Sequence, residues 1–159
     1  MSRIIFCYMK RNSRLSAVLH VILHMAERAK PMTSEELAKH MHTNAVVVRR
    51  TMAGLRDAGF VRSEKGHGGG WIIARDLNTL TLRDIYNALG SPDFFALSNR
   101  ADAPDCLVEQ SVNHALDTAF QEAEALIIER LGTITLADLA ADFHRRFDAI
   151  RKERKSHDL

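Results

Sequence analysis

The strongest constraint on the fold is a pair of short helical segments with only about three residues between them. Thr33 and Glu36 have the spacing of a capping box, which predicts that a helix starts there. Thr43 or Asn44 can then cap a third helix, and Gly59 stands where its C-terminal left-handed residue would be. Two helices joined this tightly are typical of a helix-turn-helix.

Two further elements flank this pair. Residues 14–29 carry apolar side chains at three- and four-residue spacing, which predicts an amphipathic helix before Pro31. After the third helix, the strand-like stretches 60–65 and 71–74 enclose a five-residue segment that is glycine at every position but one, a pattern typical of a β-hairpin. Three helices and a hairpin in this order predict a winged helix, with Trp71 packed at the hairpin base.

The second half of the chain predicts a short helix, a loop and two further helices. Thr81 with Asp84 caps the short helix, which ends at Gly90. Residues 91–110 are polar and are expected to form the loop. Residues 111–131 carry a broad apolar stripe and predict a helix roughly 30 Å long, and Thr135 with Asp138 caps a last helix. The expected fold class is mainly α with a small β-hairpin. The chain is expected to comprise a winged helix-turn-helix in 9–90, a loop in 91–110, dimerisation helices in 111–150 and a charged tail in 151–159.

Charge is distributed unevenly along the chain. Residues 1–75 hold 13 basic and 5 acidic side chains, whereas residues 76–159 hold 9 basic and 15 acidic ones. A basic half joined to an acidic half favours contact with a polyanion through the N-terminal part, although a solvated basic surface has the same composition. The apolar stripe of 111–131 is more than one subunit can readily cover, which predicts a homodimer.

The composition also indicates a compartment. No apolar stretch is long enough to span a membrane. The two cysteines, Cys7 and Cys106, are far apart and give no sign of an oxidising environment. We therefore expect a cytoplasmic protein. No Ser/His/Asp or paired-carboxylate pattern indicates an enzyme.

The third helix has an unusual outer face. Helical geometry places Val46 and Arg50 opposite its core side, with Arg49 on a flank. An exposed valine beside two arginines suits a DNA major groove, where arginine pairs with guanine or phosphate and an apolar group touches a thymine methyl. Thr43 and Asn44 can contact phosphate at the helix start. The alternative is that Asn44 only caps the helix and the arginines are only soluble surface.

The glycine-rich turn is the predicted wing. Its glycines allow close approach to a sugar-phosphate wall, where basic side chains can enter the minor groove. A nucleotide-binding loop is the rival, but Trp71 stands where that fingerprint needs another glycine. The candidate DNA-binding residues of the wing are Lys65, His67, Gly68 and Gly69.

The histidines raise the question of a metal site. His20 and His24 lie four residues apart, a spacing that can hold a metal on one helical face. Both are expected opposite the apolar stripe, on an ordinary polar face. His40 and His42 lie at the turn between two helices and are expected near phosphates. The sequence therefore predicts no metal site.

The residues quoted above resemble a known family. Segments 44–50 (NAVVVRR), 55–61 (LRDAGFV) and 65–71 (KGHGGGW) are similar to the Rrf-two family of winged-helix transcription regulators, as are 80–85 (LTLRDI) and 134–139 (ITLADL). The family includes iron–sulfur-cluster and nitric-oxide-responsive repressors and the cysteine-metabolism repressor. The resemblance covers roughly residues 10–140. It implies a dimer built on the long helix, a recognition helix in the major groove of double-stranded DNA and a wing at the minor groove, and it favours Met9 as the biological start.

One departure concerns the cofactor. Cluster-bearing members carry three closely spaced cysteines before the long helix, whereas this chain has only Cys106 there. A cluster needs four ligands, mostly thiolates, so we expect the branch without one and no cofactor. Cys106 is a possible redox-sensing thiol near a helix start, or simply a small apolar residue. The sequence does not identify the effector, which is either a small molecule or a redox signal. The alternatives to a DNA-binding repressor are a winged-helix module for protein interaction and a thiol or iron–sulfur redox sensor.

Overall fold

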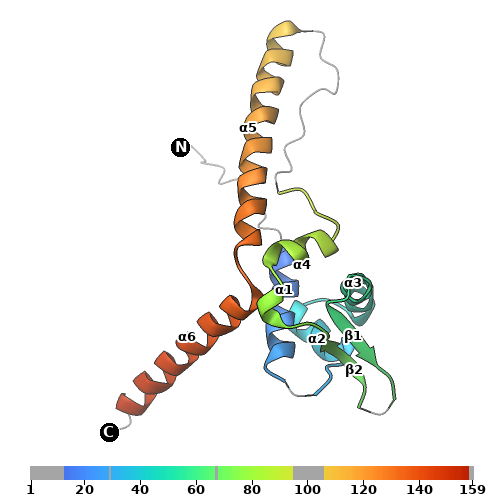
Figure 1. Ribbon diagram of the computed structural model, residues 1–159, viewed down its shortest axis with the longest axis vertical. Helices are drawn as coiled ribbons and strands as arrows, with labels where there is room; N and C mark the ends of the chain where they lie inside the picture. Colours follow the sequence, from blue (N-terminus) through green and yellow to red (C-terminus); the bar gives the residue numbers. More distant parts are fainter. Residues whose placement is uncertain (1–12, 29, 67, 95–105, 158–159) are drawn as a thin grey trace, which may run out of the picture.

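The computed structural model describes residues 13–28, 30–66, 68–94 and 106–157, and its helices and strands follow the predicted order (Figure 1). The elements are α1 (Ser13–Ala26), α2 (Ser34–Met41), α3 (Ala45–Asp57), β1 (Val61–Glu64), β2 (Gly70–Ile73), the 3₁₀ turn η1 (Leu77–Thr79), α4 (Leu82–Ala88), α5 (Leu107–Gly132) and α6 (Leu136–His157).

Local hydrogen bonds explain where the helix pair starts and stops. The Thr33 hydroxyl accepts from the backbone N–H of Glu36 at 3.2 Å, and the Glu36 carboxylate accepts from the N–H of Thr33 at 2.8 Å. This reciprocal pair is the predicted capping box. Asn44, rather than Thr43, caps α3, and Gly59 follows that helix with a φ of +77°. The predicted helix-turn-helix is therefore confirmed.

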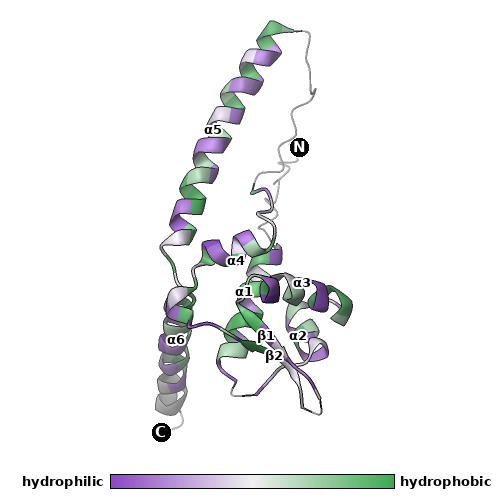
Figure 2. Cartoon of the chain, turned by 45° about the vertical axis from the view of Figure 1, so that its right-hand side comes forward, coloured by the Kyte–Doolittle hydropathy of each residue, from purple (hydrophilic) through white to green (hydrophobic). Residues whose placement is uncertain are grey.

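The core lies where α1, α2, α3 and α4 meet. Val18, Leu37, Met52 and Ile85, one from each of these helices, are fully or almost fully buried. Figure 2 shows apolar residues on these packed helices and also at intervals along α5. Leu136, at the start of α6, joins the same cluster. Burying such side chains is the dominant stabilising term of a small domain.

The wing is anchored to the helices by a third extended segment. β1 and β2 pair antiparallel, with Ser63 opposite Trp71. Met32, just before α2, forms an isolated bridge to Trp71 through two backbone hydrogen bonds of 3.1 and 2.8 Å. The buried indole N–H of Trp71 donates to the Ser34 hydroxyl at 3.0 Å. The predicted core role of Trp71 is confirmed, and this contact links the wing to the start of α2.

The last two helices have different boundaries from those predicted. α5 begins at Leu107, inside the predicted loop 91–110, of which 95–105 lie outside the described residues. The extended Cys106 is its N-cap and makes no side-chain capping hydrogen bond. α6 continues to His157, through most of the segment expected to be a charged tail. In Figure 1, α5 and α6 project from the compact part in different directions. α6 is tied to that part by a bridge between Thr81 and Thr135.

Candidate nucleic-acid interface

Helix α3 presents the outer face that the sequence predicts. Its buried residues are Val48, Thr51, Met52 and Leu55. Val46 is 70 % exposed, and Arg49 and Arg50 are also exposed. A single Asn44 side-chain oxygen accepts from the backbone N–H groups of both Val46 and Val47 at 3.0 Å. Asn44 is therefore engaged as a cap, as the alternative interpretation held, while it remains exposed at the helix start.

The two arginines differ in their surroundings. Arg49 donates to the carboxylate of Glu35 on α2 at 2.6 Å, and both side chains stay more than half exposed. Such an exposed ion pair is worth little in stability. Arg50 forms no ion pair with any residue in the described ranges. Glu35 was not predicted as part of this surface, because only the packing of α2 on α3 brings it to Arg49.

The turn of the wing requires glycine at several positions. Gly66 and Gly68 have φ values of +97° and +81°. A Cβ on Gly69 would lie 2.3 Å from the backbone oxygen of Glu64. Lys65 is exposed beside this turn, whereas His67 lies outside the described residues. The turn geometry agrees with the predicted hairpin.

The recognition-type helix and the wing are neighbours. α3 leads through Gly59 and the buried Phe60 directly into β1, and α3 contacts β1. Figures 1 and 2 both show α3 and the hairpin on the side of the molecule away from α6. The elements that carry the predicted DNA-binding residues thus share one side of the domain.

The histidines are arranged differently from the prediction. His40 is half-buried, and its ring packs against that of His24, with centroids 4.2 Å apart. The polar face of α1 that carries His20 and His24 is therefore in contact with α2 and is not wholly open to solvent. His42 is exposed and ends α2 in a left-handed conformation, with φ +50°. The packing of α1 on α2 could not be read from spacing along either helix.

Cys106 is exposed at the N-terminus of α5. The backbone N–H groups of Glu109 and Val108 lower the pKa of its thiol below the ordinary value. The chain has two cysteines in all. One thiol per protomer at this loop does not fit an iron–sulfur cluster, which is held by four ligands that are mostly thiolates.

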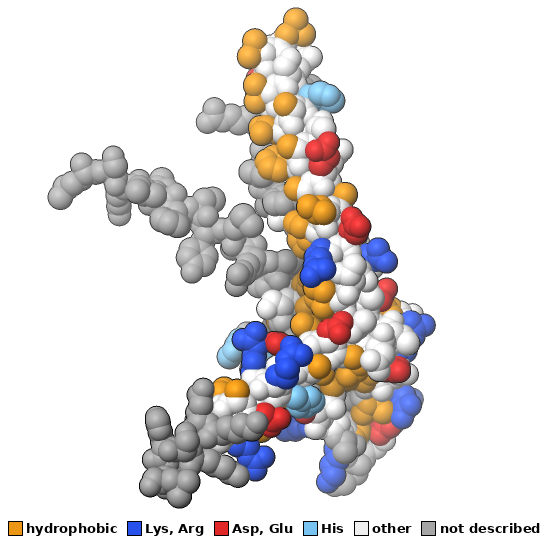
Figure 3. Space-filling view, turned by 60° about the vertical axis from the view of Figure 1, so that its left-hand side comes forward, with side chains coloured by type: hydrophobic (Ala, Val, Ile, Leu, Met, Phe, Trp, Pro, Cys, Tyr) orange, Lys and Arg blue, Asp and Glu red, His pale blue; other side chains and the backbone are white. Residues whose placement is uncertain are grey.

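Helix α5 leaves a row of apolar side chains exposed. Figure 3 shows hydrophobic side chains following one another along its length. None of the residues of α5 is buried, although its C-terminal part contacts α4. The exposed large apolar residues of this helix are Leu107, Val108, Val112, Leu116 and Leu126. A contiguous apolar surface of this kind marks an interaction site.

Three packed helices, a tight turn before α3 and a glycine-rich hairpin define a winged helix-turn-helix protein of the DNA-binding class. The comparison with protein families agrees: residues 11–142 match the Rrf2 family, described as iron-dependent transcriptional regulators. The chain belongs to this family, the one its sequence resembles. Its members are transcription regulators and not enzymes.

Two curated relatives are also named as transcriptional regulators. YwnA of Bacillus subtilis, named as an HTH-type transcriptional regulator, is 28 % identical over 128 residues, which cover 80 % of this chain and 95 % of YwnA. YffB of Lactococcus lactis, with a similar name, is 24 % identical over 144 residues, or 83 % of this chain and 87 % of YffB.

Solved structures show the same fold. A transcriptional regulator from Lactobacillus plantarum superposes with a TM-score of 0.68 and 25 % identity, covering 89 % of this chain and 97 % of that one. The protein titled IscR from T. potens superposes with a TM-score of 0.53 and 26 % identity, and the match covers 82 % of this chain and 85 % of that one. CymR, the global cysteine regulator of B. subtilis, superposes with a TM-score of 0.58, and the match covers 89 % of this chain and 98 % of that one. At 19 % identity this match shows a likeness of fold alone. Among the described helices, none combines the length and apolar character needed to cross a bilayer.

Proposed function

We propose that this protein is a repressor that binds operator DNA as a two-fold homodimer in the cytoplasm. In this proposal α3 enters the major groove and the wing lies at the adjoining minor groove. The observation that carries it is the outer face of α3, where Val46, Arg49 and Arg50 are exposed together beside the wing. Arginine and an apolar methyl group are the side chains that read guanine and thymine in the major groove.

Positioning contacts surround this face. The N-terminus of α3 attracts phosphate through its positive dipole end, and exposed Thr43 and Asn44 lie there. Lys65, His67, Gly68 and Gly69 of the wing are proposed to follow the sugar-phosphate wall, since a turn built of glycines can come close to it. Phosphate contacts fix the register, and the base contacts of α3 give the sequence preference.

Dimerisation is proposed to run through α5. Its exposed apolar row has no cover within the described part of one chain, and burial of such a surface against a second copy favours association. A two-fold dimer places two recognition helices about 34 Å apart, one turn of DNA. The proposal therefore requires a palindromic operator.

The direct test is fluorescence anisotropy on duplexes that tile the genome around the protein's own gene. We expect one duplex to bind at about 10⁻⁸ M or tighter, at least about 10³-fold more tightly than a scrambled duplex. Equal affinity for both duplexes, or no binding below micromolar, would contradict the proposal. Retention of an acidic protein partner in excess competitor DNA would instead support the interaction-module alternative.

The first mutational prediction concerns Arg50. Arg50→Ala is expected to weaken operator binding by about 1–3 kcal/mol, roughly 5- to 150-fold, if the guanidinium reads a base. Binding to scrambled DNA should change much less. Arg146→Ala on α6 is the control, because Arg146 is also exposed but pairs with Asp142 on α6, away from α3. Equal affinities of the two variants would remove Arg50 from the interface.

A second prediction tests the ion pair at Arg49. Glu35→Gln removes the carboxylate that Arg49 now contacts at 2.6 Å, so the arginine is released for DNA. Operator affinity is expected to rise by about 0.2–1 kcal/mol at low salt, the usual worth of an exposed pair, and less at high salt. Glu122→Gln on α5 is the control for loss of one negative charge. Anisotropy titrations at two salt concentrations measure both, and a weaker Glu35→Gln complex would count against Arg49 as a DNA contact.

A third prediction concerns the cofactor. We propose that the protein works without an iron–sulfur cluster, because the loop before α5 offers only the Cys106 thiol. Protein purified without oxygen is expected to contain no acid-labile sulfide and no visible cluster absorption. Acid-labile sulfide in the wild-type protein that is lost in the Cys106→Ser variant would overturn the proposal that no cluster is bound. A redox role of the Cys106 thiol remains compatible with the lowered pKa at the start of α5.

A further inference from the structure

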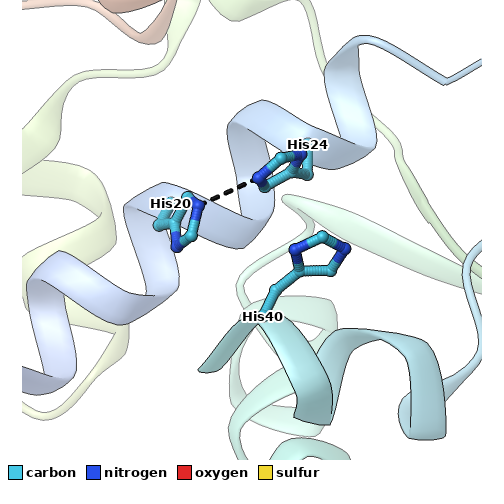
Figure 4. Close-up of side chains that lie close together, drawn as sticks. All are labelled: His20, His24 and His40. Atoms are coloured by element: carbon cyan, nitrogen blue, oxygen red, sulfur yellow. Dashed lines mark hydrogen bonds between the residues drawn. The ribbon is translucent and has the colours of Figure 1, made fainter. Parts of the chain in front are cut away.

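Three imidazole rings from two helices meet on one side of the domain. His20 and His24 lie one turn apart on α1, and His40 reaches them from α2 (Figure 4). The Nε2 atoms of His20 and His24 are 2.9 Å apart. One ligand nitrogen from each of the three rings can be chosen so that all lie within 4.8 Å of one another.

This spacing is close to what a metal ion requires. Zinc–nitrogen bonds of about 2.0–2.1 Å in a tetrahedron place the ligand nitrogens roughly 3.3 Å apart. Small rotations of the three side chains would bring the nitrogens to that separation. His20 is exposed while His24 and His40 are half-buried, so an ion could enter from solvent and keep one position for water.

The surroundings of His24 are those of a partly buried ring among other cationic or imidazole side chains. Partial burial, the neighbouring His40 and His20 and the charge of Arg28 lower the pKa of His24, against the opposing carboxylate of Glu27. Arg28 is itself paired with Glu36 at 3.1 Å, and Glu27 with His144 of α6 at 3.0 Å. A cleft of about 160 Å³ adjoins the two rings of α1, and its lining residues are His20, Leu23, His24, Glu27 and Phe143.

We propose that His20, His24 and His40 together bind one divalent first-row transition-metal ion of the zinc type. Imidazole is a preferred ligand of zinc, copper and nickel. Three protein nitrogens with one open position resemble an accessible site more than a closed structural one. The site uses residues apart from Cys106, and it would exist whether or not the protein binds DNA.

The position of the ion has a structural consequence. It would cross-link α1 to α2, the helix that packs directly on α3. A bound ion should therefore stabilise the helix-turn-helix, since a ligand that binds only the folded state shifts the unfolding equilibrium. Thermal unfolding is expected to occur at higher temperature with zinc than with a chelator.

The test uses the full chain, stripped with a chelator and titrated with cobalt(II) and with zinc against a chromophoric competitor. Wild-type protein is expected to bind one ion per protomer, with the visible bands of four-coordinate cobalt. His20→Ala and His40→Gln should each weaken zinc binding by at least about 100-fold, since loss of even a second-shell partner costs 10- to 100-fold.

Three variants control for other ligands. His42→Asn removes a nearby histidine outside the cluster and keeps a residue that tolerates its left-handed backbone. His114→Ala and Cys106→Ser each remove another side chain that could bind a metal, both at the N-terminal half of α5. All three should bind zinc like wild type. The proposal fails if wild-type protein binds no ion, if His20→Ala binds within tenfold of wild type, or if Cys106→Ser alone abolishes binding. Because His20 is exposed, His20→Ala should fold normally, and circular dichroism can check this.

Discussion

Replacing Leu116 with aspartate is expected to convert the proposed dimer into monomers at micromolar concentration. Leu116 is 45 % exposed on α5, between Val112 and Leu126 in the apolar row. An uncompensated buried charge costs about 3–5 kcal/mol, and a two-fold interface would bury two of them. One such cost alone raises the dissociation constant by on the order of 10²- to 10³-fold, so the rise should be at least that large. Sedimentation velocity over a dilution series measures it.

A matched control separates the interface from the helix itself. Gln121 is exposed on the opposite face of α5, so Gln121→Asp adds the same charge without entering the apolar row. It should leave the dimer unchanged. Operator binding by Leu116→Asp should also weaken strongly, because two half-sites are then bound by separate molecules. A wild-type protein that sediments as a monomer, or a Leu116→Asp dimer as stable as wild type, would remove α5 from the proposed interface.

Replacing Trp71 with alanine is expected to cost about 3–5 kcal/mol of unfolding free energy, the usual range for a buried tryptophan. Trp71 is only 9 % exposed. Its indole donates to Ser34, and its backbone forms the bridge to Met32. The substitution therefore leaves a cavity where the wing and α2 are joined. Urea unfolding at a fixed protein concentration measures the loss.

Two milder substitutions separate the contributions at this position. Ser34→Ala leaves the buried indole N–H without its acceptor and should cost about 1–3 kcal/mol. Trp71→Phe keeps most of the apolar volume and should fall between wild type and Trp71→Ala. A Trp71→Ala protein within about 1 kcal/mol of wild type would mean that the wing is not held by this contact.

The features that were predicted well are short-range ones. The capping boxes at Thr33, Thr81 and Thr135 all form, because each depends on residues three apart on one turn. The left-handed Gly59 and the glycine hairpin also follow from local backbone preferences. The outer face of α3 was predictable because helical periodicity assigns its core side.

The features that were missed depend on packing between elements. His40 joins His24, and Glu35 joins Arg49, only because α2 lies against both α1 and α3. No spacing within one helix reports such a neighbour. The interpretation of 91–110 as one polar loop missed the start of α5 at Leu107, because the composition of the whole segment hides the apolar Leu107 and Val108 at its end.

The amino-acid sequence by itself determined the order of the elements, their caps and turns, and the family, since these depend on neighbours along the chain. Only the tertiary structure decided which side chains from different helices meet. It placed three imidazoles together and set a carboxylate beside Arg49, because such meetings depend on the angles at which helices cross.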